Sequence, residues 1–312
     1  MSTLTVFDFH NRFRTESDCA EYLFKLRWPE GFICPRCGQK RGYKVKNRSL
    51  IRCRDCLYEA SVTAGTVLHR SKLPLRLWFW GAYLVATNGP GISAMQFHKQ
   101  VGLKRYEPAF QMLHKIRSVA NQEMDSPLSG VVQVDETFLG YKATGGKRGR
   151  GAAKKTMVVA AVEVGRGRSG DYAKAIRMRA VPNGSYDVLG RFIKERVVPG
   201  SIVITDDWTG YAPLSRDGYQ HRVVDTEQGL RVIHHVFANL KAWINGTHKH
   251  VSKKHAQTYL NEFCYRYNGR MNKASTFERI MRLLASRTGP TQEQLKRAGK
   301  RGGWLHWNPP MT

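Results

Sequence analysis

The chain has 312 residues and carries 51 Lys and Arg against 24 Asp and Glu, a formal net charge of +27. Such an excess of positive charge costs self-repulsion in the folded state and favours a polyanionic partner, for which nucleic acid is the best candidate. No apolar run approaches the ~18 residues that a membrane-spanning helix needs, and no lipidation motif is present, so no membrane partner is expected.

Residues 1–70 are expected to form a short helix that ends before Pro29, followed by a zinc ribbon. Cys34 and Cys37 form one CxxC pair, Cys53 and Cys56 a second, with fifteen residues between them. This spacing favours four thiolates on one tetrahedral, structural Zn²⁺. Two disulfides, or four buried thiols, are the alternative. No signal peptide is evident, so we expect a reducing cytoplasm and no disulfides.

Residues 71–125 are expected to form a DNA-binding region like a helix-turn-helix. Helices are predicted over 75–87, 92–102 and 106–120, with glycine turns between them. The longer third helix carries Lys115 and Arg117, which we expect to contact DNA. A plain three-helix bundle is the alternative.

Residues 126–290 change periodicity and are expected to form an α/β domain, followed by a basic tail over 291–312. Three strands, a helix, two strands and a helix are predicted in succession, and two further helices follow. This order is typical of an RNase H-like (retroviral integrase-like) mixed sheet flanked by helices. The predicted ranges are 131–140, 156–165 and 172–181, then 186–197, 201–205 and 221–225, then 232–244, 253–268 and 275–286.

Carboxylates occupy positions in this domain where burial is costly. Asp135 lies in an apolar strand, and Asp206 and Asp207 directly follow a buried strand. In the predicted fold these two strands are neighbours, so their aspartates converge and a divalent metal could bridge them. Strand alternation leaves the choice between Asp206 and Asp207 open, although we favour Asp206. A helix-capping role is the alternative.

The helix predicted over 232–244 offers further groups. His234 and Lys241 are seven residues apart, about 20° on a helical wheel, and therefore share a face, whereas Asn239 is about 140° from His234. The alternative is a packed or capping His234 and a solvated Lys241.

From the segment LFKLRWPEGFICPRCG through CRDC, VDETFLG, TDDWTGY and VFANLKAWINGTHKH to YLNEFCYRYN, the chain resembles bacterial insertion-sequence transposases with an N-terminal zinc ribbon and an RNase H-like, DDE-type (ISXO2-like) catalytic domain. In this family two aspartates and a glutamate hold two divalent metals, Mg²⁺ or Mn²⁺, and a lysine seven residues after the glutamate contacts DNA. The resemblance thus implies that Asp135 and Asp206 are the two metal-binding aspartates and that Lys241 is the lysine that contacts DNA.

The glutamate position of the family falls on His234 in this sequence, which departs from the family pattern. Imidazole suits Mn²⁺ better than Mg²⁺, so metal preference is expected to differ. Other candidates for the third ligand remain open, namely Asn239, Glu227 and Glu262.

The resemblance implies that the enzyme binds double-stranded DNA, namely the element's terminal inverted repeats and the target. It implies that the enzyme cleaves DNA to expose a 3′-hydroxyl, which then attacks the target DNA in strand transfer. The active form is expected to be a homo-oligomer in the bacterial cytoplasm, associated with the nucleoid. A basic loop after the first strand of the α/β domain is expected to hold the DNA backbone, through Lys147, Arg148, Arg150, Lys154 and Lys155. The alternatives are a DNA-binding regulator with a silent RNase H-like domain and a structure-selective nuclease.

Overall fold

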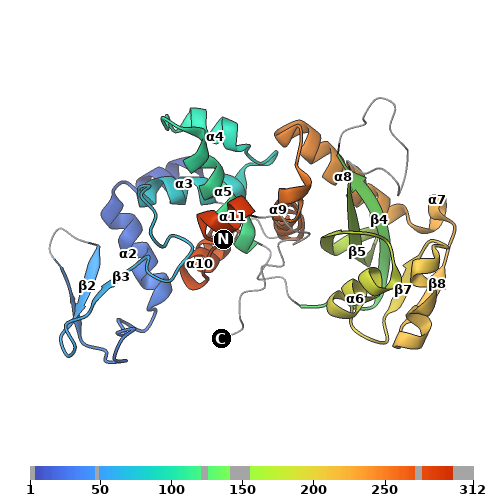
Figure 1. Cartoon of the computed structure of the whole chain (residues 1–312), viewed down its shortest axis with the longest axis horizontal. Helices are drawn as coiled ribbons and strands as arrows, with labels where there is room; N and C mark the ends of the chain where they lie inside the picture. Colours follow the sequence, from blue (N-terminus) through green and yellow to red (C-terminus); the bar gives the residue numbers. More distant parts are fainter. Residues whose placement is uncertain (1–3, 46–48, 121–125, 141–154, 271–275, 298–312) are drawn as a thin grey trace. The chain divides into compact units, whose positions relative to one another are not determined.

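The computed structural model describes residues 4–45, 49–120, 126–140, 155–270 and 276–297 (Figure 1). Contacts divide these residues into two compact units. The first comprises residues 4–120 and 276–296, and the second comprises residues 126–270. In the sequence, the α/β unit is thus inserted between two parts of the first unit.

The first unit begins with two short helices, α1 (Val6–Arg12) and α2 (Glu16–Arg27). Each starts with a capping box, in which a threonine accepts a backbone N–H of the first turn and an aspartate returns the bond: Thr5 with Asp8, and Thr15 with Asp18. A small antiparallel sheet follows, made of β1 (Gly42–Lys44), β2 (Leu50–Cys53) and β3 (Glu59–Ser61). The helix predicted to end before Pro29 is α2, which the small sheet follows as expected, whereas α1 was not predicted.

The helical part of the first unit draws on both ends of the chain. Its helices are α3 (Leu75–Thr87), α4 (Ala94–Gln100), α5 (Tyr106–Ala120), α10 (Thr276–Ser286) and α11 (Gln292–Arg297). In Figure 1 the red-orange α10 lies against the blue and cyan helices, and it contacts α2, α3 and α5. Phe277 of α10 joins an aromatic cluster with Phe9, Phe13, Tyr22 and Phe79.

This grouping differs from the expected division of the chain, which assigned residues 126–290 to the α/β domain. By its contacts α10 belongs with the N-terminal helices, and the backbone N–H of Val67 donates to the carbonyl of Leu284. The pattern of α10 predicted an amphipathic helix correctly. That pattern does not say which apolar surface α10 covers, because the apolar face of an amphipathic helix can pack against the core of either unit.

Arg117 requires a correction to the sequence analysis. Its side chain is fully buried, and Nη2 donates a 2.7 Å hydrogen bond to the carbonyl of Ile92, just before α4. Arg117 therefore ties the turn before α4 to α5, and the expected DNA contact through this residue is wrong. The turn between α4 and α5 contains Gly102, whose φ of +65° is the left-handed conformation that glycine adopts without strain.

The second unit is built on a mixed five-stranded sheet with the strand order β6-β5-β4-β7-β8. The strands are β4 (Val131–Leu139), β5 (Thr156–Gly167), β6 (Gly170–Val181), β7 (Ile202–Thr205) and β8 (Gln220–Val223). The pairs β4–β5 and β5–β6 are antiparallel, whereas β4–β7 and β7–β8 are parallel. This mixed sheet flanked by helices confirms the fold class predicted from the sequence.

Helices cover both faces of the sheet. One face packs on α8 (Arg231–Trp243) and α9 (Ala256–Gly269), and the other on α6 (Tyr186–Arg196) and the 3₁₀ helix η3 (Thr209–Asp217). The short helix α7 (Thr226–Gly229) leads into α8, and the short π turn η4 (Ile244–His248) and 3₁₀ turn η5 (Lys253–His255) follow it. Because strand residues alternate between faces, Val132 and Val134 pack toward α6, and Gln133 and Asp135 point toward α8.

The outer edge of β6 is covered by amide side chains of α9. Gln257 accepts from the N–H of Ala180 and donates to the carbonyl of Met178, and Asn268 bonds both backbone groups of Ile176. An uncovered strand edge offers unpaired backbone groups to other chains, so these bonds close one side of the sheet.

In the part of the chain that the structure describes, no helix has the length and apolar character required to cross a membrane.

Candidate active site and metal centre

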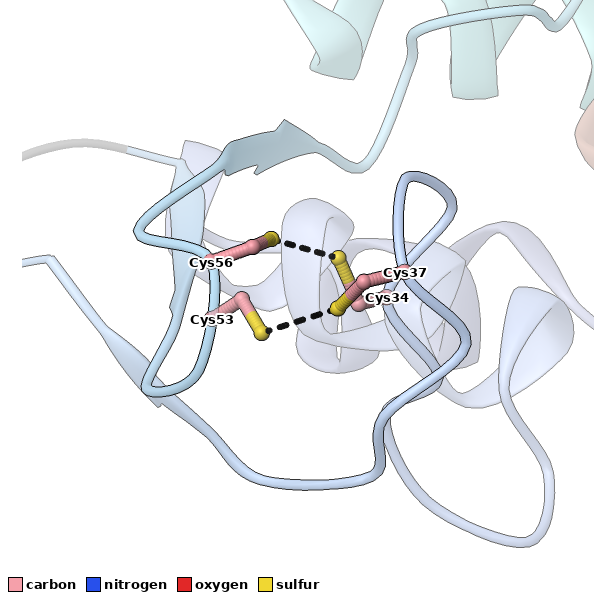
Figure 2. A group of neighbouring side chains, drawn as sticks. All are labelled: Cys34, Cys37, Cys53 and Cys56. Carbon is pink, nitrogen blue, oxygen red and sulfur yellow. Dashed lines mark hydrogen bonds between the residues drawn. The ribbon is translucent and has the colours of Figure 1, made fainter.

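The four cysteines of the CxxC pairs come together at one end of the ribbon. Figure 2 shows Cys34 and Cys37 on one loop facing Cys53 and Cys56 on the other. The Sγ atoms of Cys34 and Cys56 are 3.6 Å apart, as are those of Cys37 and Cys53, and all four lie within 4.8 Å of one another. None of these cysteines forms a disulfide.

This sulfur cluster fits a zinc ion. Four thiolates at a Zn–S distance of about 2.3 Å in a tetrahedron place their sulfur atoms about 3.8 Å apart, close to the separations found here. Burial would raise the pKa of Cys34, but hydrogen bonds from the backbone of Cys37 and Arg36 and from neighbouring thiols lower it to about 7. One thiolate is therefore readily available to a metal. The geometry supports a structural Zn²⁺ at this position.

In the second unit, Asp135 and His234 are in direct contact. Oδ2 of Asp135 lies 3.1 Å from Nε2 of His234, and Oδ1 accepts a 2.7 Å hydrogen bond from the N–H of Glu136. Burial raises the pKa of Asp135 above its ordinary value, and the nearby charge of Asp206 adds to the rise. The Glu136 N–H and the His234 ring oppose this shift without cancelling it. A buried carboxylate with a raised pKa beside an imidazole is characteristic of functional sites.

Asp206 reaches the same region from the neighbouring strand. In the parallel pair β4–β7, Gln133 lies opposite Ile204, and continuing this register by two residues brings Asp135 level with Asp206. Oδ1 of Asp206 also accepts a 3.1 Å hydrogen bond from the N–H of Trp208, so this residue caps the turn as well. Asp207 is exposed, and its charge is not among the causes of the Asp135 pKa shift. The geometry therefore favours Asp206, as the sequence did.

The helix α8 carries the remaining predicted groups. His234 and Lys241 both lie within its continuous helical span, so the wheel that puts them on one face applies. The His234 side chain is 42% exposed, and Lys241 and Asn239 are exposed. The His234 imidazole is therefore accessible to solvent, whereas the carboxylate that it contacts is buried.

Of the spare carboxylates, Glu262 lies in the interior of the second unit. It is fully buried in α9, with a carboxylate oxygen 4.0 Å from Nη1 of Arg266 on the same helix. Glu262 thus lies close to a basic side chain within α9, and its role as a third ligand stays a prediction. Glu227 lies in α7, but its side chain is outside the described residues.

Among the described residues, the four cysteines are the one group of three or more metal-ligating side chains gathered closely enough to surround an ion. Asp135 and His234 touch, whereas Asp206 acts on Asp135 through its charge. Carboxylates and an imidazole are donor types that Mn²⁺ and Mg²⁺ accept, with the nitrogen favouring Mn²⁺.

The structure describes only some of the residues that were predicted to contact DNA. Lys155 is half-buried just before β5, and Lys115 of α5 is half-buried with its pKa lowered by burial. The other basic residues of the predicted loop lie outside the described residues: Lys147, Arg148, Arg150 and Lys154.

Tyr211 in η3 was missed by the sequence analysis. Its phenol is buried beneath the site, where burial and then the charges of Glu136, Asp135 and Asp206 raise its pKa well above the ordinary value. Nothing in the local sequence TGY distinguishes it from a surface tyrosine, because the carboxylates that affect it are those of Glu136 and Asp135 in β4 and of Asp206 after β7.

Two family models match this chain, one over each of the regions that carry these sites. Residues 14–59 match the transposase zinc-ribbon domain, and residues 127–268 match the ISXO2-like transposase domain. An "uncharacterized protein in transposable element ISH50" of Halobacterium salinarum is 24% identical over 280 residues, covering 80% of this chain and 90% of that protein.

A crystal structure of a pre-cleavage Mos1 transpososome aligns with 64% of this chain and 75% of that one, at 12% identity and a TM-score of 0.26. At that TM-score the likeness adds nothing to the fold established by the sheet itself. The two matched domains, in this order, are those expected from the sequence motifs. The chain therefore belongs to the ISXO2-like insertion-sequence transposases with an N-terminal zinc ribbon.

Proposed function

We propose that this transposase binds the terminal inverted repeats of its element and carries out metal-dependent DNA strand cleavage and strand transfer. The observation that carries the proposal is the contact of Asp135 with His234 next to Asp206, where Asp135 lies in the middle of β4 and Asp206 directly follows the neighbouring parallel strand β7. An acidic group buried in the central strand of a sheet is costly unless a cation offsets the cost.

The residues of the site take distinct roles in this proposal. Asp135 and Asp206 hold divalent ions through their carboxylates, and His234 completes the donor set where the family has a glutamate. When bound, two such ions supply Lewis-acid stabilisation of the attacking and leaving oxygens. Lys241, exposed on the same helix as His234, binds a phosphate and keeps the scissile bond in place.

DNA binding in the first unit then falls on surfaces other than Arg117. Exposed basic side chains flank the turn between α4 and α5, at Lys99, Lys104 and Arg105. We place the contact with the repeat there, because the first residues of the second helix in a helix-turn-helix approach the bases. Lys115 and the basic segment that includes Lys155 contribute charge to backbone binding.

An element has two ends that must be cut and joined together, so the proposed active form is a homo-oligomer on double-stranded DNA. Its site of action is then the nucleoid in the cytoplasm.

The test uses the full chain with duplexes carrying the element's terminal repeats, scrambled duplexes as controls, and Mg²⁺ or Mn²⁺. We expect cleavage and strand transfer that require the repeats, with Mn²⁺ supporting more activity than Mg²⁺, and loss of both reactions in Asp135→Ala. End binding, measured by gel shift, should persist in the variant.

One observation favours a second candidate, a DNA-binding regulator with a silent catalytic domain. The family's third acid is replaced by His234, and Glu262 is enclosed in α9. Equal inactivity of the wild type and Asp135→Ala, with end binding retained, would establish the regulator. Cutting without preference for the repeats and without strand transfer would establish a nuclease instead.

A further inference from the structure

Gln133 is a buried polar residue that no part of the proposed chemistry uses. It lies in β4 two residues before Asp135, on the same face of the strand, and is 6% exposed. Its Nε2 donates a 2.9 Å hydrogen bond to the carbonyl of Gly229, and its Oε1 accepts a 2.9 Å hydrogen bond from the N–H of Ile233. One side chain thus joins β4 to a segment 100 residues away.

The two bonded groups are the end of α7 and the first turn of α8. The first N–H groups of a helix have no partner within the helix and need a cap. The residue before α8, Leu230, supplies no side-chain cap, so Gln133 provides from another element the cap that α8 lacks. Gly229 is required here, because a Cβ at this position would lie 2.3 Å from the Val224 side chain.

The capped residue, Ile233, directly precedes His234. A hydrogen bond from β4 to the Ile233 N–H therefore fixes the position of α8 along its axis and its rotation about that axis. Both are fixed next to His234, the residue that contacts Asp135. Side chains reach about 5–6 Å from a helix axis, so a rotation of roughly 10° displaces a ring by about 1 Å. A misplacement of about 1 Å can cost a reaction on the order of 100-fold.

We infer that Gln133 is a positioning residue, which holds the start of α8 against β4 so that the His234 imidazole meets the Asp135 carboxylate. The inference deepens the proposed function and rests on it for its consequence in catalysis. The positioning of α8 by Gln133, the geometric part of the inference, depends only on hydrogen bonds within the protein and not on the proposed function.

The geometric part is tested first, on the metal-free full chain. Gln133→Met keeps the length of an unbranched side chain and removes both hydrogen bonds. The readout is the ¹⁵N spectrum of the imidazoles, in which the signal of His234 is identified by its loss in His234→Ala. We expect the His234 signal to shift in Gln133→Met and the other resolved histidine signals to stay in place.

Gln257→Met is the matched control. Gln257 also bonds one backbone N–H and one carbonyl of a strand in the same unit, those of Ala180 and Met178, but on β6. Both variants should lose a few degrees of melting temperature, and only Gln133→Met should move the His234 signal. Gln133→Asn, which keeps the amide but is one methylene shorter, serves as the milder variant and should give a smaller shift.

Activity is tested second, by Mn²⁺ affinity and repeat-dependent cleavage. Loss of a group that orients a ligand typically costs 10- to 100-fold in metal affinity or activity, which is the loss expected for Gln133→Met and not for Gln257→Met. Because Gln133 acts through His234, adding Gln133→Met to His234→Ala should cost nothing further.

An unchanged His234 signal in Gln133→Met and Gln133→Asn overturns the inference, as does a full additional loss in the double variant. A shifted signal together with a wild type that never cleaves DNA upholds the positioning of His234 and rejects the proposed function. The two failures are therefore distinguishable.

Discussion

Asp135 and His234 are 99 residues apart in the chain, yet Oδ2 of one lies 3.1 Å from Nε2 of the other. The aspartate is buried in the middle strand of the sheet and the histidine stands on the helix that covers it. Burial raises the pKa of the carboxyl group, so the folded chain holds this charge at a cost in stability. Such a cost is expected of a site selected for binding a cation.

Asp135→Asn should stabilise the metal-free chain while abolishing cleavage. The pKa of Asp135 is raised above 3.8 in the folded state, so the folded chain binds this proton more tightly than the unfolded chain does. Its stabilising contribution is complete below the unfolded pKa and is lost as pH rises through the folded pKa. Calorimetry at pH 7 should therefore show a higher melting temperature in the variant than in the wild type.

The difference in melting temperature between the Asp135→Asn variant and the wild type should disappear as the pH falls toward 3.8, the ordinary pKa of an aspartate. Asp207→Asn is the control, because Asp207 is exposed and the substitution should leave the melting temperature unchanged. An Asp135→Asn chain less stable than the wild type at pH 7 would contradict the argument.

The two adjacent aspartates after β7 should behave differently in strand cleavage. Asp206→Ala removes a carboxylate that is close enough to affect the pKa of Asp135, and cleavage should fall by at least about 100-fold. Asp207→Ala removes an exposed group and should retain most of the activity. Each variant controls for the other, and the reverse order of effects would move the metal site to Asp207.

Cys34→Ser should release the zinc ion of the ribbon. The ion's binding free energy, about 10–16 kcal/mol in small zinc domains, is also folding free energy for β1–β3. We expect about one equivalent of zinc in the wild type and almost none in the variant, measured by metal analysis. Cys19→Ala is the control, since Cys19 is buried in α2 away from the cluster and its loss should leave the zinc content unchanged.

Phe277→Ala should destabilise the N-terminal unit, although Phe277 comes after the α/β unit in the sequence. The ring is 2% exposed and contacts several aromatic rings of α1, α2 and α3. Truncation of a buried Phe costs about 3–5 kcal/mol. Hydrogen exchange should show the loss of protection in α1–α3.

The matched control for that variant is Phe192→Ala. Phe192 is 1% exposed in α6 of the other unit, so its truncation should lower protection around the five-stranded sheet and leave α1–α3 protected. Loss of protection in α6 rather than α1–α3 on truncating Phe277 would place α10 with the α/β unit.

Much of the second unit was predictable because its signals are local. An apolar run such as that of β5, or the alternation around Asp135, depends only on a few neighbouring residues. The strand ranges predicted from these patterns differ from the observed ones by at most about two residues at either end, and Asp135 and Asp206 were expected to converge once the strand order was inferred. The cysteine spacing likewise identified the four members of the sulfur cluster.

Burial of polar groups was not predictable in this way. Arg117 and Glu262 are charged residues on helices, and their sequence neighbours are compatible with solvent or with DNA. Whether they are enclosed depends on α4 in one case and on the interior of the α/β unit in the other.

The sequence by itself determined the zinc ribbon, the order of strands and helices, and the placement of Asp135 in an apolar strand, because spacing and periodicity encode them locally. Only the tertiary structure decided that α10 packs with the N-terminal helices, that Arg117 is internal, and that Gln133 caps α8 beside His234. These are contacts between residues 25 or more positions apart. Their free energy comes from burial and from satisfying backbone groups of another element, which no local pattern records.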